Sequence, residues 1–182
     1  MLDDPQNSPI TSSDKYFLYE EDNINLVNTG REWFGESFSF DFSQDFTTPI
    51  ENWNADTILF SGNFAARSSI GSTFEINNGS SNLGSVYIPA LSSSSNDYYK
   101  TTFIEQEFFN SDFSSDISLF FDNNGNSSAQ AWLDYFILQG RQNGIFNVQP
   151  TSHYLFRDTR SVAESAMTCF QLSKLNNDYT FS

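Results

Sequence analysis

The 182-residue sequence is short of cysteine, of basic residues and of long apolar runs, and each shortage excludes a class of protein. Cys169 is the single cysteine, which excludes an internal disulfide and a multi-cysteine metal site. Eight Lys and Arg residues are scattered among 23 Asp and Glu residues, so the formal net charge is −15. Without a basic stripe to neutralise phosphates, nucleic acid and anionic membrane surfaces are poor partners. The acidity is better suited to keeping the protein in solution.

The chain also lacks the apolar segments that cross or enter membranes. Its apolar runs are far shorter than the roughly 20 residues of a membrane-spanning helix. The first 13 residues (MLDDPQNSPITSS) are polar and acidic, without the basic start and apolar middle of a signal peptide. The sequence therefore predicts no membrane span. Either the protein stays inside the cell, or the chain is a piece whose export signal lies elsewhere.

Aromatic residues are abundant, and they follow the two-residue period of β-strands. The chain contains 20 Phe, 8 Tyr and 3 Trp, and no stretch keeps a helical period. The sequence predicts an all-β protein, an antiparallel β-sandwich or jelly roll of about ten short strands with little helix. The predicted strands are Tyr16–Tyr19, Thr29–Phe42, Thr57–Phe60 with a continuation to Ser69, Ser72–Ile76, Ser85–Ile88, Tyr98–Phe109, Ile117–Phe121, Gln130–Gln139, His153–Asp158, Ala166–Leu172 and Tyr179–Phe181.

The most aromatic of these strands is Thr29–Phe42 (TGREWFGESFSFDF). Four phenylalanines share one parity and should face the core: Phe34, Phe38, Phe40 and Phe42. Gly35 interrupts the run where a bulge or a close backbone approach is easiest. Three charged residues should lock the entry of this strand: Arg31, Glu32 and Glu36.

The strand Gln130–Gln139 differs from the others because both of its faces are apolar. Trp132 and Phe136 lie on one parity, and Leu133 and Tyr135 on the other. Such a strand should be central in its sheet and covered on both sides. Asp134 is the exception and needs a partner if it is buried.

Two groups of acidic and amide residues were tested as calcium sites. The adjacent carboxylates of residues 20–22 are better read as a solvated turn, because neighbouring side chains diverge on an extended chain. Asp122, Asn124 and Asn126 have the spacing of an EF-hand loop. However, Ser127 stands where Gly is needed and Leu133 where Glu is needed. Asn124–Gly125 instead predicts a hairpin turn, as does Asn77–Gly79.

Two enzymatic or binding alternatives follow from single residue types. Cys169 and His153 are the only nucleophile–base pair available for a small cysteine hydrolase. Cys169 nevertheless sits mid-strand, where a free cysteine usually packs as a small apolar residue. The Trp and Tyr residues can form a sugar-stacking platform, as in a carbohydrate-binding β-sandwich, although their parities fit core packing better. No catalytic, cofactor-binding or metal-binding residue is assigned.

Three segments carry a resemblance to a known family: KYFLYEEDNINLVNTGREWFGE (Lys15–Glu36), AQAWLDYFILQGR (Ala129–Arg141) and YLFRDTRS (Tyr154–Ser161). In this order and spacing they resemble the region preceding the catalytic domain in type IX secretion system sortases of the PorU family. These are gingipain-like cysteine endopeptidases on the surface of Bacteroidota. The family usually has Gly–Trp where this chain has Ala131–Trp132, and a basic pair where Arg141 is followed by Gln142.

The resemblance implies a non-catalytic β-domain fragment. Residues 1–14 would be a mobile lead-in and 15–150 a β-sandwich domain. Residues 151–182 would add strands leading toward a catalytic Cys/His domain that this chain does not contain. The full-length sortase would cleave C-terminal signals from secreted cargo and attach the cargo to surface lipopolysaccharide.

The resemblance also implies partners and a location. The partners would be the parent's own peptidase domain and outer-membrane secretion-system subunits, at the cell surface as part of the parent protein. Strands that normally pair with chain outside the fragment would leave an unpaired edge, through which the isolated piece should self-associate.

Overall fold

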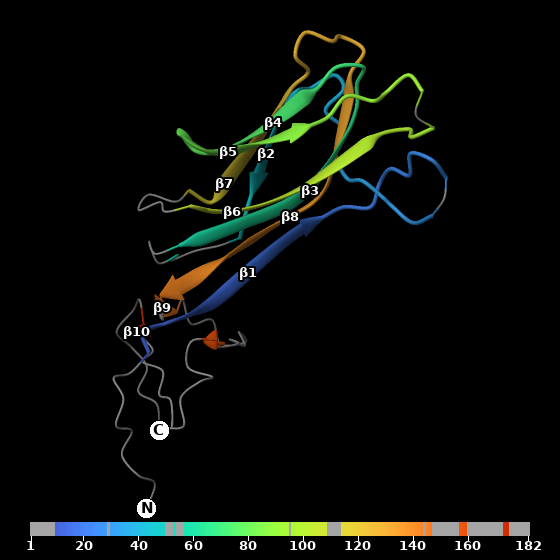
Figure 1. Ribbon diagram of the computed structural model, residues 1–182. Helices are drawn as coiled ribbons and strands as arrows, with labels where there is room; N and C mark the ends of the chain where they lie inside the picture. Colours follow the sequence, from blue (N-terminus) through green and yellow to red (C-terminus); the bar gives the residue numbers. More distant parts are fainter. Residues whose placement is uncertain are drawn as a thin grey trace, which may run out of the picture.

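Alternating apolar and polar side chains produce eight strands in two antiparallel sheets, seen in the computed structural model of Figure 1. The strands are β1 (Ser12–Glu20), β2 (Ser43–Thr47), β3 (Ile58–Arg67), β4 (Ser72–Asn78), β5 (Ser81–Ile88), β6 (Lys100–Phe108), β7 (Asp116–Asp122) and β8 (Gln130–Asn143). A two-residue parallel pair, β9 (Ile145–Phe146) and β10 (Ser173–Lys174), forms a separate small sheet just after β8. The structure describes residues 10–28, 30–49, 53, 57–94, 96–108, 114–143, 145–146, 157–159 and 173–174.

The strand order is that of a jelly roll. The first sheet has the order β1-β8-β3-β6 and the second the order β2-β7-β4-β5. The first strand therefore pairs with the eighth, the second with the seventh, the third with the sixth and the fourth with the fifth. This is the pattern of a long hairpin of four strand pairs that is folded over into two sheets. The predicted all-β sandwich is confirmed, and the described residues contain no α-helix.

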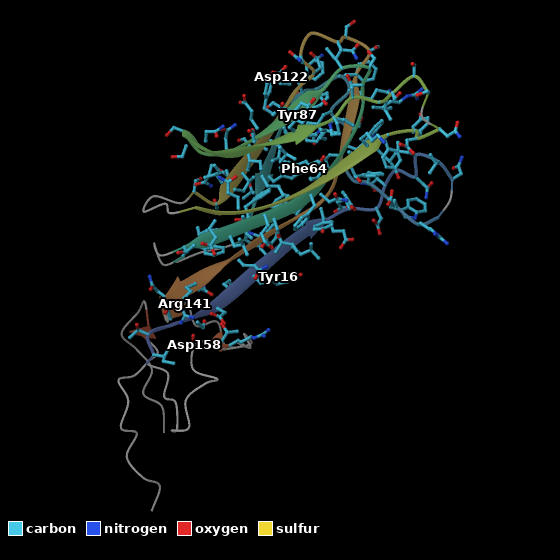
Figure 2. The ribbon with its side chains drawn as sticks, in the orientation of Figure 1. Tyr16, Phe64, Tyr87, Asp122, Arg141 and Asp158 are labelled. Atoms are coloured by element: carbon cyan, nitrogen blue, oxygen red, sulfur yellow. The ribbon has the colours of Figure 1, made fainter. Side chains whose placement is uncertain are left out.

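The core lies between the two sheets and is dominated by phenylalanine. Phe64, Phe74 and Phe136 are completely buried, and Figure 2 shows Phe64 between the two layers. The Phe64 and Phe74 rings, from opposite sheets, lie 4.8 Å apart. Such inter-sheet ring pairs stabilise by about 0.5–1.5 kcal/mol beyond their burial. They fix how one sheet lies on the other.

Several predicted strands are confirmed with their predicted faces. In β7, Ile117, Leu119 and Phe121 are buried while the residues between them are partly or fully exposed. The turn after β7 has positive φ at Asn124 (52°) and Gly125 (81°), but β7 and β8 belong to different sheets, so the hairpin predicted there is wrong. The hairpin predicted at Asn77–Gly79 is confirmed, because β4 and β5 pair on either side of it.

The predicted central strand is β8, which lies between β1 and β3. Both faces of β8 look apolar in the sequence because a bulge changes which residues face the core, and strict alternation does not predict this bulge. The pairing with β3 shifts so that Asn63 faces Tyr135 and Phe64 faces Leu133, which leaves Asp134 as an extra, bulged residue. Leu133 and Phe136 consequently both face the inter-sheet core, although they differ in parity.

The predicted strand Thr29–Phe42 is wrong. The described part of this segment is irregular and joins other strands only through single bridges, Ile24 to Phe34 and Ser37 to Trp132. Phe34 and Phe38 are buried as predicted, but Phe40 is fully exposed, so the alternation breaks. The physical reason is that the segment bonds to β8 only at separate points and turns Phe34 onto Trp132 and Ala65, so no continuous ladder forms.

Gly35 in this segment does allow the predicted close approach. A side chain there would place its Cβ 2.8 Å from the Cβ of Glu21. The backbone of the same segment bonds to β8 where β1 has ended: Gly35 N–H donates to the Leu133 carbonyl and Phe38 N–H to the Ala131 carbonyl.

Other boundaries also differ from the predicted ones. β1 begins at Ser12, so Ser12, Ser13 and Asp14 belong to the strand and not to a lead-in that extends to residue 14. β2 was not predicted at all. Arg157 and Asp158 are not in a strand, and the remainder of the predicted strands at 153–158, 166–172 and 179–181 lies outside the described residues. Within the described ranges, no helix is long and apolar enough to span a membrane.

Candidate functional site

The side of the first sheet that faces away from the core carries a group of exposed apolar side chains, which we call the outer face. Tyr16 is 58% exposed, Leu18 37% and Phe103 55%. The strand registers set Tyr16 beside Gln139 and Leu18 beside Ile137, and Phe103 across β3 from Tyr135. The apolar members of the outer face come from all four strands: Tyr16, Leu18, Leu59, Phe103, Tyr135 and Ile137.

Acidic residues flank the apolar side chains. On β6, Glu105 pairs with Ser61 and Glu107 with Leu59, and both glutamates are exposed. At the end of β1, exposed Glu20 pairs with Tyr135. The outer face thus combines an apolar centre with a carboxylate rim, a combination that disfavours the phosphate backbone of a nucleic acid.

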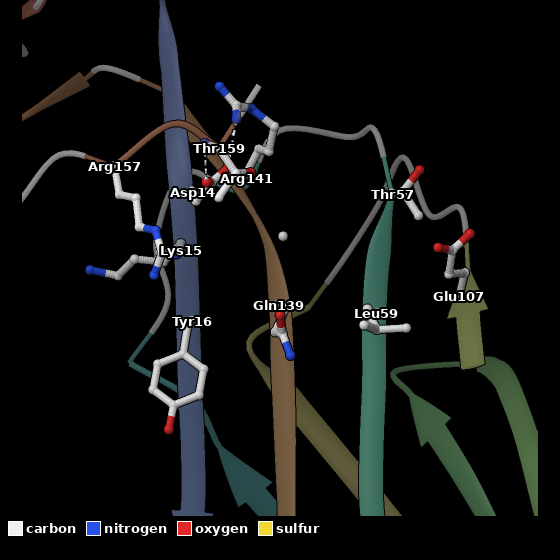
Figure 3. Close-up of a pocket in the computed structure, with 11 residues that line it drawn as sticks. Asp14, Lys15, Tyr16, Thr57, Leu59, Glu107, Gln139, Arg141, Arg157 and Thr159 are labelled. Atoms are coloured by element: carbon white, nitrogen blue, oxygen red, sulfur yellow. Dashed lines mark hydrogen bonds and ion pairs between the residues drawn. The ribbon is translucent and has the colours of Figure 1, made fainter. Parts of the chain in front are cut away.

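One end of the outer face is hollowed into a groove, shown in Figure 3. Tyr16, Gln139 and Leu59 stand side by side on β1, β8 and β3 along it. The far ends of the groove are lined by Arg157 and Thr159 on one side and by Thr57 and Glu107 on the other.

Arg141 at this end is buried and bonds to three residues, two on β1 and one in the segment 157–159. Its Nη1 donates to Asp14 Oδ1 and to Asp158 Oδ1, each at 2.6 Å. Its Nη2 donates to the Ser12 carbonyl at 2.7 Å, and its Nε to the Ser12 hydroxyl at 3.1 Å. The Asp158 side chain is only 2% exposed, so the guanidinium is what makes its burial tolerable.

Asp14 continues the connection through its own backbone and side chain. Its N–H donates to the Arg157 carbonyl at 2.7 Å, and its Oδ2 accepts from the Thr159 N–H at 2.8 Å. Residues 157–159 are therefore fastened to the β1–β8 pair beside the groove. We call Ser12, Asp14, Arg141 and Asp158 the arginine clamp.

The opposite end of the outer face is covered by the irregular segment after β1. Phe34 packs on Trp132 and Ala65 in a small second cluster, and Tyr99 meets the Phe34 ring edge-on at 5.3 Å. The Tyr99 hydroxyl donates to Glu32, and burial together with this bond raises the pKa of Tyr99 to about 12.

Two further side chains show how this cover is attached. Tyr19 donates its hydroxyl to Glu36, and burial with that bond raises the pKa of Tyr19. Asp134 accepts from Asn63 Nδ2 at 2.9 Å, which is the partner that the sequence requires. Burial raises the pKa of Asp134, the Asn63 bond opposes that shift, and the charges of Glu32 and Asp22 add to it.

Of the three charged residues predicted to lock the entry of a strand near Trp33, two make structural contacts. Glu32 and Glu36 accept hydrogen bonds from Tyr99 and Tyr19, which hold the cover in place rather than the entry of a strand. Arg31 is exposed. None of them faces the groove.

The structure places the other residues considered for chemistry as follows. Residues 20–22 are all exposed, and within the described ranges no three His, Cys, Asp or Glu residues gather as a metal site. Asp122, Asn124 and Asn126 form the turn between β7 and β8. Cys169 and His153 lie outside the described residues.

The tryptophans offer little for a sugar platform. Trp132 is buried, and Trp53 packs against the core over Gly140, so only Trp33 is substantially exposed, at 41%. The exposed aromatics of the outer face are Tyr and Phe. This distribution matches the core-packing interpretation of two of the three tryptophans.

Sequence reasoning missed the arginine clamp. In the sequence, Arg141 is only the last residue of a segment that resembles a known family, and its partners Ser12 and Asp14 fall in the predicted lead-in. A lone arginine at the end of an apolar strand was the available signal, because a buried arginine must find carboxylates.

Comparison with known proteins supports the fold alone. No protein-family model matches the chain, and no curated protein matches its sequence. Among solved structures, dimeric latent PorU from Porphyromonas gingivalis is similar with a TM-score of 0.63 and 14% identity. The match covers 85% of this chain but 15% of that one, so this chain spans a small part of PorU's length.

A family 6 carbohydrate-binding module is also similar, at 19% identity over 57% of this chain and 85% of the module. Its TM-score is 0.28, which is too low to carry an argument about either fold or function. The chain has a PorU-like β-sandwich fold.

Proposed function

We propose that this chain is the non-catalytic β-domain of a PorU-like type IX secretion sortase. In that setting it supports the peptidase part of a longer surface protein, which removes C-terminal signals from secreted cargo and attaches the cargo to lipopolysaccharide. The chain itself performs no catalysis in this proposal.

The observation that carries the proposal is that the three resembling segments form one unit in space. Lys15–Glu36 supplies most of β1 and the cover, and Ala129–Arg141 supplies most of β8. Tyr154–Ser161 contains residues 157–159, which the arginine clamp fastens to both strands. Segments more than 100 residues apart thus make mutual contacts, as expected if the sequence resemblance reflects a shared structural unit.

The fold likeness to PorU over 85% of the chain points in the same direction. Under the proposal the domain works at the cell surface, next to the peptidase domain and the outer-membrane subunits.

The DNA that follows codon 182 tests the proposal directly. We expect it to encode a Cys- and His-bearing peptidase region, either in frame or after a frameshift. An unrelated gene at this position, with no peptidase region nearby, would overturn the assignment.

A glycan array tests the carbohydrate-binding alternative with the same protein. We expect no saturable sugar binding. Saturable binding that Trp33→Ala abolishes, and that Tyr87→Ala on the second sheet leaves intact, would replace the proposed function with the carbohydrate-binding one.

A further inference from the structure

We infer that the outer face of the first sheet docks a protein surface with an apolar centre and a Lys/Arg-rich rim, and that this surface belongs to the peptidase part of the same longer protein. The inference rests on the proposed function for the identity of the partner. Its chemistry rests on the side chains of the outer face.

The exposure of the outer face is the first step. Tyr16 and Phe103 each leave more than half of their area to solvent, although they stand on sheet strands with packed cores beneath them. Aromatic side chains of this kind provide the anchors of protein interfaces because they bury a large area with few rotatable bonds. They stand on opposite edge strands, so a partner that contacts both must span the whole sheet.

The rim of the outer face is negatively charged, and this charge favours a basic partner. Glu105 and Glu107 are exposed along β6, and Glu20 is exposed on β1. No Lys or Arg stands opposite them in the strand registers. Carboxylates around an apolar centre favour an approaching surface with basic groups and repel an acidic one.

A second copy of the chain is a poor occupant for the same reason. The net charge is −15, and two outer faces packed together would bring acidic rims into proximity. The groove end offers Lys15 and Arg157 as exposed cations, but they lie at the end of the face away from Glu20.

Residues 157–159 lie at the border of the outer face. The arginine clamp holds this segment at the groove, at the border of the outer face. The chain therefore passes directly beside the outer face on its way toward its C-terminal part. The peptidase part of the same longer protein would have a raised effective concentration near this surface.

The test uses the 182-residue chain and the separately produced peptidase region of the sortase from the same organism. Binding is measured by calorimetry at low and at physiological salt. We expect saturable binding that weakens as salt rises, because exposed charges are screened over about 10 Å at 0.1 M salt.

Variants then locate the site. Tyr16→Glu and Phe103→Glu should each weaken binding by at least about tenfold, since each puts a charge into the centre of the contact. The double variant Glu105→Lys/Glu107→Lys should also weaken binding and should flatten its salt dependence. Matched controls on the second sheet, Tyr87→Glu and Glu75→Lys, should bind as the wild type does, and thermal melting shows which variants are folded.

The outcomes separate the inference from the proposed function. Binding that none of the outer-face variants changes overturns the inference and leaves the proposed function in place. The absence of binding by folded wild-type chain overturns the inference as well, as does self-association that Phe103→Glu, on the edge strand opposite β1, abolishes. A genome without a peptidase region overturns the proposed function itself.

Discussion

At the residue scale, Arg141 shows how one buried charge organises the end of the sandwich. It makes five hydrogen bonds to Ser12, Asp14 and Asp158, and the Asp158 carboxylate has almost no contact with water. Arginine suits this place because its planar fork of donors serves several acceptors at once.

We expect Arg141→Ala to lower the free energy of unfolding by about 3–5 kcal/mol, because it leaves Asp158 buried without its cation. Urea denaturation followed by circular dichroism measures the change. Arg67→Ala is the control: Arg67 is exposed and lies over the Tyr98 ring, and its loss should cost no more than about 1 kcal/mol.

A second variant tests whether the uncompensated charge of Asp158 causes the loss of stability at the arginine clamp. Arg141→Met combined with Asp158→Asn removes both charges, and it should recover part of the stability that Arg141→Ala loses. Equal losses in the two variants would mean that the uncompensated charge of Asp158 is not what destabilises Arg141→Ala.

Asp134, unlike Arg141, is a residue whose charge opposes folding. Burial raises its pKa above the ordinary value of 3.8, so the folded state binds the proton more tightly than the unfolded state does. The wild type must then lose stability as the pH rises from that ordinary value through the higher folded pKa. Above this window the carboxylate is charged and disfavoured in the folded protein.

We therefore expect Asp134→Asn to be more stable than the wild type at pH 7 and equally stable near pH 3. Asparagine is the same size and still accepts the hydrogen bond from Asn63 through its carbonyl oxygen. Thermal melts of both proteins across this pH range measure the difference. A stability difference that stays constant with pH would show that the charge of Asp134 is not its cause.

At the scale of elements, the strands that follow simple alternation were predictable and those shaped by distant contacts were not. Ile117, Leu119 and Phe121 identify β7 because each faces the core while its neighbours face out. Phe34 and Phe38 show the same spacing, yet their segment bonds to β8 at separate points and leaves Phe40 in solvent. The alternation of apolar residues in the sequence indicates which side chains prefer burial. It does not indicate which surface covers them.

The candidate site was less predictable than the fold for a similar reason. The outer face consists of residues such as Tyr16 and Phe103 whose exposure depends on what lies above the sheet. In the sequence they are indistinguishable from core aromatics. The clamp partners Asp14 and Arg141 are 127 positions apart, so no local pattern joins them.

The bulge at Asp134 leads to a prediction about deletion. Removing Asp134 lets Leu133 precede Tyr135 directly, which restores strict alternation on β8 without changing the face of any other residue. We expect this variant to fold cooperatively and to lose about 1–3 kcal/mol, mainly from the unpaired Asn63 amide. Thermal and urea unfolding measure both properties.

Deletion of Ile137 is the matched control on the same strand. It shifts the residues after it by one position, so that Leu138 turns outward and Arg141 leaves its carboxylates. This variant should not fold cooperatively. If both deletions behave alike, the bulge is not what sets the faces of β8.

At the scale of the whole molecule, the jelly roll leaves two edge strands in each sheet, and these edges differ in how well they resist other chains. β6 carries Lys100, Glu105 and Glu107, charged residues of the kind that discourage strand addition. β1 is also an edge strand, but the middle of it carries the uncharged residues Tyr16 and Leu18.

The direction of the hydrogen bonds identifies the open donors of β1. Asp14 N–H donates to Arg157 and hence points away from β8. By the two-residue period, the N–H groups of Tyr16 and Leu18 point the same way, and within the described ranges neither donates to another backbone group. We expect the isolated chain to self-associate through this edge, reversibly and with rising concentration.

Leu18→Pro tests this expectation, because proline removes the outward donor and is tolerated on an edge strand. Analytical ultracentrifugation should show a larger species at high concentration for the wild type and a monomer for Leu18→Pro. Leu18→Ala keeps the N–H and removes the side chain, so it should associate as the wild type does. If Leu18→Ala also becomes monomeric, the contact runs through the outer face and not through the edge. A wild type that stays monomeric at every concentration would show that the β1 edge is closed to a second chain.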